Sequence, residues 1–431
     1  MRYLILFLFC FYFAMPVGKA NLPAGEAGEA MMQSMQSQMS SIEDLVKTMQ
    51  KTLVDLRTTV ENQNEVIQQQ NIRINALEGG KATPQTTQSS PVKVAGLSQG
   101  FNPDIGVVGT VQAHITEDGE DAEGKDTVTL KELELSFAQY VDPYSRLDAV
   151  IAFNDNLEPQ NVDIEEAYYS HWGLPWGFVG RIGKFRTLVG KQNLQHRHQL
   201  DTVNYPLVIR NFFGEEGMSS FGVRLQNFIP NPWDIPIELT GEVLRGNNGD
   251  SFGGISRRPV FNTHIDAFFE LSDDATLEIG GTWMNGDENV EGSAKGDDRF
   301  GVHIFGGDAT LLWHLPNNRT VKWQNELYYQ HRADVNTPNI SPWGFYSLVD
   351  FRLSPKFSAG IRFDYLQPRE VDGEHDESYE ISPYITFWQS EFANFRLQYS
   401  HVEPAANDGE TDDAVHLQAN FLIGAHSHPV A

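Results

Sequence analysis

Two closely spaced pairs of histidines are the residues of this sequence best suited to hold a metal ion. His196 and His198 lie near the middle of the chain, and His426 and His428 lie close to its end. Imidazole nitrogen is a good zinc ligand, and histidines this close can share an ion. Neither pair has a cysteine or a tight set of carboxylates beside it in the sequence. Zinc binding is therefore a hypothesis that two histidines alone do not establish.

A second group of residues could act on ions through charge. The basic members are Arg146, Arg181, Lys184, Arg186 and Arg224, and the acidic members are Asp201, Glu215 and Glu216. The acidic residues fall in one long connection, residues 187–216, and the basic residues fall in stretches where apolar and polar residues alternate. Charges that face confined water can select among solutes. The alternative is that these charges only wet a water-filled interior.

No pattern typical of an enzyme accompanies these residues in the sequence. A phosphate-binding loop, a dinucleotide fingerprint and a metalloprotease motif are all missing. Ser400 and His401 are adjacent, so on a strand they would point to opposite faces and could not bond as nucleophile and base. The net charge is −27 without a basic patch, which argues against a nucleic-acid partner. We expect no enzymatic activity and no organic cofactor.

Alternating apolar and polar residues dominate the sequence from residue 101 to residue 431. Phe357, Ile361 and Phe363, for example, alternate with polar residues such as Arg362 and Asp364. Each such strand has one apolar and one polar face. The expected strands are roughly 104–116, 126–141, 144–154, 161–172, 176–186, 217–228, 235–245, 261–271, 274–285, 300–314, 319–331, 343–353, 356–366, 378–388, 392–402 and 412–424. The prediction is an all-β fold, a sixteen-stranded antiparallel transmembrane β-barrel with its apolar face outward.

The connections between these strands support a barrel that crosses a membrane. Those after even-numbered strands are short, as at Asp142-Pro143 and Ser354-Pro355, and those after odd-numbered strands are mostly long. Short turns on one side and long loops on the other are typical of outer-membrane barrels whose N-terminus is periplasmic. A soluble sandwich gives no reason for this asymmetry.

The first hundred residues have a different composition. Residues 1–20 are expected to be a secretory signal peptide, with Arg2, an apolar core and a small-residue cleavage site. Cys10, the only cysteine, lies within it. A short segment, 21–30, precedes an apolar heptad pattern over 31–78, which predicts an α-helical periplasmic coiled coil. Residues 79–100 are polar and rich in Gly, Ser, Thr and Pro, and are expected to be a flexible linker.

The region 101–431 resembles the general and phosphate-selective porins of bacterial outer membranes. The resemblance rests on the strand-and-loop pattern and on the stretch Arg181–Arg186, followed by Gly190. A coiled coil before a barrel is also similar to sugar-specific porins. The resemblance implies a homotrimer in the Gram-negative outer membrane, in contact with lipids and lipopolysaccharide. It also implies that Thr187–Glu216 is the third outer loop, which in porins folds into the lumen and narrows it.

A second resemblance concerns that same connection. The run from Gly190-Lys191-Gln192-Asn193 through His196 and His198 to Gly214–Gly217 looks like that of small barrels described as zinc-regulated outer-membrane receptors. The expected function is a porin for passive diffusion of small hydrophilic solutes or ions. Two alternatives stay open: a zinc-linked uptake channel or receptor, and a structural protein whose barrel only anchors an envelope-tethering coiled coil.

Overall fold

The structure, a computed structural model, describes residues 103–116, 127–153, 162–245, 251–252, 258–289, 299–333, 341–368, 377–403 and 412–424. All of them belong to the second of two compact units, residues 95–431. The expected signal peptide, coiled coil and linker lie outside the described residues, as do His426 and His428. Within the described part, no helix has the length and apolarity needed to span a membrane.

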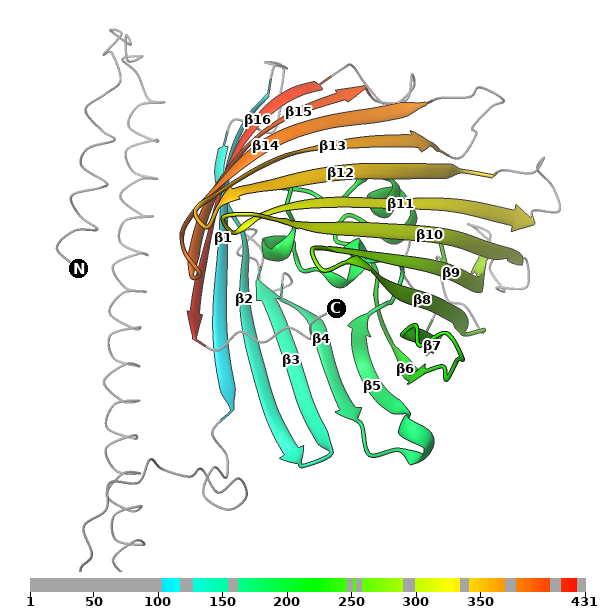
Figure 1. The fold of residues 1–431 in the computed structure, drawn as a ribbon. Helices are drawn as coiled ribbons and strands as arrows, with labels where there is room; N and C mark the ends of the chain where they lie inside the picture. Colours follow the sequence, from blue (N-terminus) through cyan, green and yellow to red (C-terminus); the bar gives the residue numbers. More distant parts are fainter. Residues whose placement is uncertain are drawn as a thin grey trace, which may run out of the picture. The chain divides into compact units, whose positions relative to one another are not determined.

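The described residues form one closed antiparallel barrel of sixteen strands (Figure 1). The strands are β1 (Asp104–Thr116), β2 (Thr127–Asp142), β3 (Ser145–Phe153), β4 (Val162–His171), β5 (Val179–Arg186), β6 (Ser219–Phe228), β7 (Ile237–Leu244), β8 (Val260–Ser272), β9 (Ala275–Asn289), β10 (Arg299–Leu315), β11 (Arg319–Ala333), β12 (Trp343–Ser354), β13 (Phe357–Gln367), β14 (Ser378–Ser390), β15 (Ala393–Glu403) and β16 (Asp412–Gly424). Each strand pairs with its neighbours in sequence, and β1 pairs with β16 to close the sheet. The predicted barrel and its strand number are thus confirmed.

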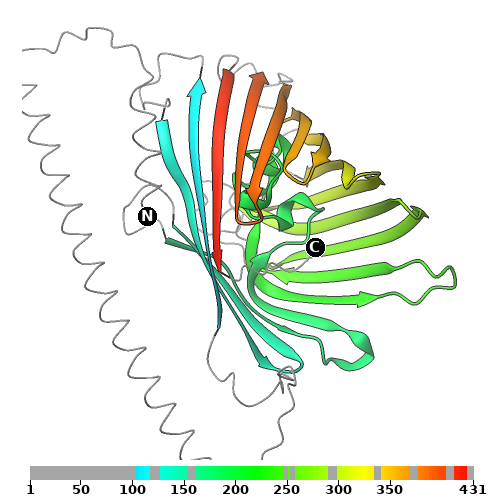
Figure 2. The same ribbon diagram turned by 60° about the vertical axis from the view of Figure 1, so that its left-hand side comes forward.

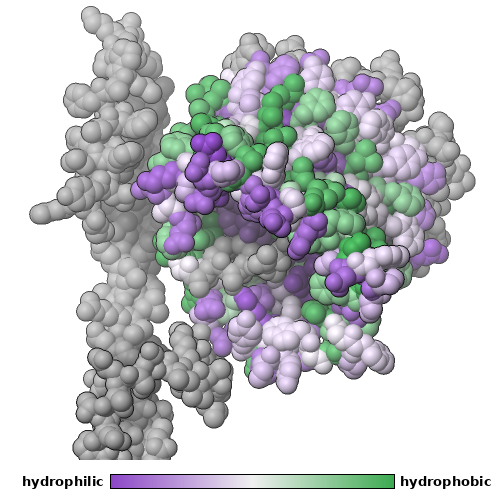
Figure 3. Space-filling view, viewed as in Figure 1, coloured by the Kyte–Doolittle hydropathy of each residue, from purple (hydrophilic) through white to green (hydrophobic). Residues whose placement is uncertain are grey.

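The alternation of the sequence sorts side chains between the two faces of the barrel wall. On β13, Phe357, Ile361 and Phe363 are exposed on the outer face, whereas Arg362 and Asp364 are completely buried on the inner face. Apolar side chains are similarly exposed along the other strands, and the outside of the barrel carries hydrophobic patches (Figure 3). A soluble protein would instead place its polar face outward.

The turns at one end of the barrel are short. Pro143-Tyr144 joins β2 to β3, and Asp273-Asp274 joins β8 to β9. Several large aromatic side chains are exposed at this end, including Trp172, Trp176 and Trp233. Trp388 also lies at this end, but its side chain is on the inner face of the wall. There the Arg352 guanidinium lies 5.4 Å from the centroid of the Trp388 ring.

The connection between β5 and β6, Thr187–Met218, lies inside the barrel, and we call it the inner loop (Figures 1 and 2). It contains two short 3-10 turns, η2 (Gln192–Leu194) and η3 (Arg197–Gln199), and one short helix, α3 (Leu207–Phe213). The helix ends at Gly214, whose φ of 100° is accessible to glycine.

The inner loop builds a hydrophobic core within the barrel. Tyr205, Ile209 and Phe213 of the loop are buried in one cluster with inward-facing side chains of the wall, among them Tyr328 and Tyr346. The ring of Phe213 meets that of Tyr328 edge-on, with centroids 5.4 Å apart. Burial of such aromatic side chains is a large stabilising contribution, so the loop is held inside the barrel by its own apolar residues.

One glycine allows the inner loop to approach the wall closely. Gly190 has a positive φ of 58°, and a Cβ at this position would lie 2.3 Å from the Tyr328 hydroxyl oxygen and 2.4 Å from Glu326 Oε2. Next to it, the backbone amides of Lys191 and Gln192 both donate to Glu326 Oε1, at 2.9 Å and 2.7 Å. A larger residue at position 190 would push the loop away from this carboxylate.

Candidate functional site

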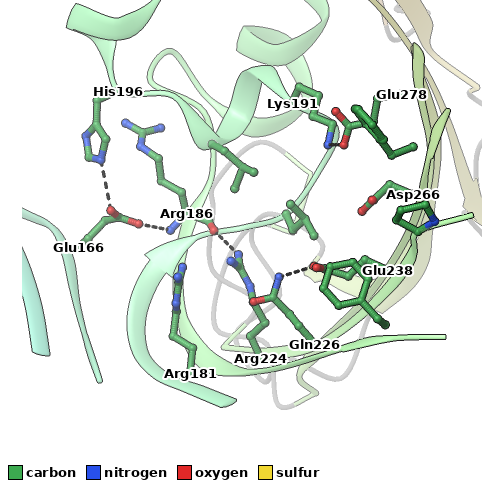
Figure 4. Close-up of a pocket in the computed structure, with 15 residues that line it drawn as sticks. Glu166, Arg181, Arg186, Lys191, His196, Arg224, Gln226, Glu238, Asp266 and Glu278 are labelled. Carbon is green, nitrogen blue, oxygen red and sulfur yellow. Dashed lines mark hydrogen bonds and ion pairs between the residues drawn. The ribbon is translucent and has the colours of Figure 1, made fainter. Parts of the chain in front are cut away.

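A charged cavity of about 420 Å³ lies between the inner loop and the inner face of the barrel wall (Figure 4). Its charged lining residues are Arg181, Arg186, Lys191, His196, Arg224, Glu166, Glu238, Asp266 and Glu278. Viewed from outside, hydrophilic side chains gather around a recess in the barrel (Figure 3). Basic and acidic groups occupy different parts of this lining.

The basic part consists mainly of two arginines that face each other across β5 and β6. Arg181 and Arg224 are cross-strand partners, a position where like charges repel. The Arg181 guanidinium lies 4.1 Å from the centroid of the Tyr168 ring, and the Arg224 Nε donates to Glu242 Oε1 at 2.5 Å. These contacts hold both guanidinium groups in place despite the repulsion.

The acidic part lies on the next strands of the wall. Glu238 and Asp266 are cross-strand partners on β7 and β8, and Glu278 follows on β9. Glu238 accepts a hydrogen bond from Gln226 at 2.8 Å, and Glu278 pairs with Lys191 of the inner loop. Burial lowers the pKa of Lys191, but Glu278 outweighs this effect and raises it. The cavity therefore has guanidinium groups on one side and carboxylates on the other, which places an electric field across it.

The other predicted charged residues are distributed more widely. Arg146 forms an ion pair with Asp148 at 2.8 Å on β3, and Asp201 of the inner loop pairs with Lys322 of β11. Glu215 is exposed at the end of the inner loop. None of these three lines the charged cavity.

Lys184 is a correction to the expected set of lumen-facing residues. It lies opposite Phe221, which is exposed on the outer face, and it binds Asp163 at 3.1 Å. Arg181 and Lys184 are three positions apart, and strand side chains alternate, so both cannot face the lumen of a regular strand. Arg186 is buried on the inside because it is the last residue of β5, and its Nη1 donates to the Glu216 carbonyl oxygen at 2.7 Å.

Next to the cavity, the inner loop is tied to the wall by four buried glutamates, Glu132, Glu134, Glu165 and Glu166, which we call the carboxylate cluster. His196, itself 1% exposed, contacts Glu165 Oε2 through Nδ1 at 2.7 Å and Glu166 Oε2 through Nε2 at 3.2 Å. Burial and the Arg186 charge lower the pKa of His196, but these carboxylates raise it to about 10.

A β-bulge explains how two successive glutamates reach the same histidine. The pairing of β3 with β4 passes from Val150 opposite Glu166 to Ile151 opposite Ile164, which leaves Glu165 as an extra residue. A bulge of this kind places two residues of one strand opposite a single partner. Both glutamates are consequently buried on the inner face.

The two histidines of the predicted pair have separate partners. His198 Nδ1 lies 2.8 Å from Glu134 Oε1, and the rings of His196 and His198 stack with centroids 6.0 Å apart. Arg197, between them, donates to Glu216 Oε1 at 3.1 Å and lies 3.8 Å from Glu132 Oε2. The loop segment 196–198 thus contacts β2 and β4 through three consecutive charged or polar side chains.

The sequence alone does not mark the carboxylate cluster as the partner of these histidines. Glu132 and Glu134 lie two positions apart on β2, so the strand pattern predicts that they share one face. Glu165 and Glu166 are adjacent and would be assigned to opposite faces, because nothing in the sequence marks the bulge. The pairing of either set with the inner loop depends on the three-dimensional fold.

Comparison with solved structures shows the same fold at very low sequence identity. The chain is similar to the anion-selective porin from Comamonas acidovorans, with a TM-score of 0.51, 10% identity, and coverage of 74% of this chain and 98% of that one. It is also similar to OmpF of Salmonella typhi, with a TM-score of 0.52, 8% identity, and coverage of 74% and 97%. For the outer membrane channel DcaP of Acinetobacter baumannii the values are 0.50, 11%, 75% and 96%. The barrel therefore has the porin fold.

Comparison of the amino-acid sequence identifies a related protein but no family model. No family model matches the sequence. A protein of Aquifex aeolicus, described only as uncharacterized, is 30% identical over 323 residues, which is 67% of this chain and 67% of that protein. The chain belongs to the same protein family as this Aquifex aeolicus relative.

Proposed function

We propose that the protein is an outer-membrane porin, a water-filled channel for passive diffusion of small hydrophilic solutes. The observation that carries this proposal is the closed barrel with an apolar exterior and a charged cavity beside its inner loop. A closed barrel satisfies every strand's backbone in a membrane, because it has no free edge. The porin fold of the similar structures supports the same function.

The placement in the membrane follows from the two ends of the barrel. The short turns, with exposed Trp172, Trp176 and Trp233, would lie at the periplasmic interface, where aromatic residues are enriched. The longer connections would face the exterior, in contact with lipopolysaccharide. We place the protein in the outer membrane of a Gram-negative bacterium, with residues 31–78 forming a periplasmic coiled coil.

The oligomer is part of the same proposal. One of the similar structures is described as a trimer form, and porins of this fold commonly assemble as trimers. The expected coiled coil would add a second association element at the N-terminus. We propose a homotrimer with one channel in each protomer.

The charged cavity would set the selectivity of this channel. A solute that passes it lies between Arg181 and Arg224 on one side and Glu238 and Asp266 on the other. Such a field orders water and orients polar molecules, whereas an apolar solute gains nothing from it. Small polar solutes are therefore the expected substrate class.

The test is electrical recording on the purified full-length protein in planar lipid bilayers. We expect stepwise, ohmic conductance increments, and liposome swelling that falls as the tested sugars become larger. The double variant Arg181→Gln/Arg224→Gln should change the reversal potential in a salt gradient, whereas Lys184→Gln, on the outer face, should not. A correctly folded barrel without conductance would refute the channel and favour the anchoring role for the barrel.

A further inference from the structure

The inner loop and the wall bring three potential metal ligands together beside the charged cavity. His196, Glu134 and Glu165 each offer one donor atom, and these atoms all lie within 4.8 Å of one another. His196 Nδ1 faces both carboxylates, at 2.7 Å from Glu165 Oε2 and 3.8 Å from Glu134 Oε2. All three residues are at least 95% buried. Donors come from three separate chain segments, β2, β4 and the inner loop.

One of these donors has an unused lone pair that points into the group. Glu134 is 1% exposed, and its Oε2 accepts no hydrogen bond from any residue that the structure describes. A buried carboxylate oxygen without a partner is costly, because it has lost its water without gaining a donor. Its other oxygen is bonded to His198, so the carboxylate is held with Oε2 directed at His196.

The surrounding contacts orient these donors as in known metal sites. His196 Nε2 can donate its hydrogen to Glu166 Oε2 at 3.2 Å, which leaves the Nδ1 lone pair for an ion. Glu165 Oε1 lies 3.5 Å from Arg186 Nη2. Histidine ligands usually donate their second ring nitrogen to a carboxylate, and ligating carboxylates are usually held by further polar groups. His198, Glu166 and Arg186 supply such contacts here.

The charge of the region also favours a divalent cation. The carboxylate cluster supplies four carboxylates, while Arg186 and Arg197 supply two fixed positive charges. In the absence of a metal, His196 adds a further positive charge, because the carboxylates raise its pKa to about 10. A divalent ion bound in place of the His196 proton would keep these carboxylates compensated, and buried carboxylates without compensation would be strongly destabilising.

We propose that His196, Glu134 and Glu165 bind a divalent transition-metal ion, with zinc as the best match, and that this ion fastens the inner loop to β2 and β4. One imidazole and two carboxylates form a donor set that zinc accepts, whereas the nitrogen donor disfavours magnesium and calcium. Ligand bonds of about 2.1 Å place tetrahedral donors roughly 3.4 Å apart, so each carboxylate oxygen needs to move by less than about 1 Å. Three protein ligands leave a fourth position for water.

This ion is a structural part of the channel and is separate from the solutes that pass it. It would replace the proton that His196 Nδ1 otherwise shares with Glu165, so binding releases a proton. Metal binding does not depend on channel activity, so a barrel without conductance could still hold the ion.

The first test measures metal in tag-free full-length protein purified in detergent. After chelator treatment and desalting, the protein is titrated with zinc against a colorimetric chelator. We expect one tightly bound zinc per chain and at least tenfold weaker binding in Glu134→Gln/Glu165→Gln. Asp163→Asn should bind zinc as wild type does, because Asp163 is an exposed carboxylate of β4 that pairs with Lys184. The variant His426→Ala/His428→Ala should retain the full stoichiometry, which separates this site from the second histidine pair.

The second measurement uses the wild-type protein, so it holds even where the double variant does not fold, as judged by heat-modifiable gel migration. X-ray absorption at the zinc edge should show a shell of nitrogen and oxygen only, with scattering from a single imidazole. Zinc should also raise the thermal transition of the wild-type barrel. Sub-stoichiometric zinc at saturation, two imidazoles in the metal shell, or unchanged binding in a folded double variant would overturn the proposal.

Discussion

Arg362 offers the sharpest test of how the inner loop is held inside the barrel. Its guanidinium, completely buried, donates to Asp364 at 2.6 Å and Glu380 at 3.1 Å on the wall. It also donates to the inner loop, to Thr202 Oγ1 at 2.5 Å and to the Asn204 carbonyl oxygen at 2.7 Å. One side chain thus joins β13, β14 and the loop.

Replacing Arg362 with Met should remove these bonds and leave the buried Asp364 carboxylate without its ion-pair partner, whereas Glu380 keeps its ion pair with Arg210 at 2.6 Å. Removing one member of a buried ion pair costs about 3–5 kcal/mol. At about 1.4 kcal/mol for each factor of ten, the unfolding equilibrium should shift by more than a hundredfold. The measurement is reversible urea unfolding of protein refolded into phospholipid vesicles, followed by tryptophan fluorescence.

Two further variants decide whether charge is the cause. Arg352→Met is the matched control, because Arg352 lies near the short-turn end of β12 and donates to the Pro355 carbonyl oxygen at 3.3 Å in exposed surroundings. It should cost less than about 1 kcal/mol. Adding Asp364→Asn to Arg362→Met should restore part of the lost stability, because it neutralises the buried carboxylate that lost its partner. Equal stability of Arg362→Met and Arg352→Met, or a double variant less stable than Arg362→Met alone, would refute a charge effect.

Three other predictions concern the loop, the cavity and the N-terminal segment. Gly190→Ala should loosen the inner loop, because its Cβ would overlap Tyr328 and Glu326; protease cleavage within the loop should become faster than in wild type, and equal rates would contradict the close approach. Arg181→Gln should shift the reversal potential toward cations and Glu238→Gln toward anions, each by roughly a twofold change in permeability ratio, since a charge about 8 Å away in water contributes about 0.5 kcal/mol; shifts of the same sign would contradict the field. Leu53→Asp should weaken the oligomer on native gels without unfolding the barrel, and an unchanged oligomer would mean that the heptads do not drive assembly.

The strand pattern could be predicted from the sequence because the membrane-facing and lumen-facing sides differ at every second residue. The expected bounds agree with the observed strands to within four residues, and β1, Asp104–Thr116, agrees at both ends. The long connection after β5 was also recognisable, because no other connection is comparable in length. These features depend on local pattern, which a sequence records directly.

The contacts of the site could not be predicted, because they depend on breaks in that pattern and on long-range pairing. Alternation from Arg181 places Lys184 on the outer face, against the expectation that it lines the lumen. Glu165 reaches the lumen only through a bulge. The donor group of His196 and Glu134 joins residues whose proximity is set by the path of the inner loop, and local periodicity carries no information about that path.

The path of the inner loop also bears on the order in which this protein folds. The loop follows β5, yet the Val203 amide bonds to Gln398 on β15, and Asn204 bonds to Glu380 on β14. The residues it contacts on β2 and β4 precede the loop in the sequence and are synthesised before it. Those on β13 to β15 follow the loop and are synthesised long after it. The loop therefore cannot complete its contacts until the last strands have formed, so its docking and the joining of β1 to β16 should occur late and together. A chain stalled before β13 would hold an open sheet with the aromatic residues of the loop uncovered, and such an intermediate needs protection during its passage to the membrane.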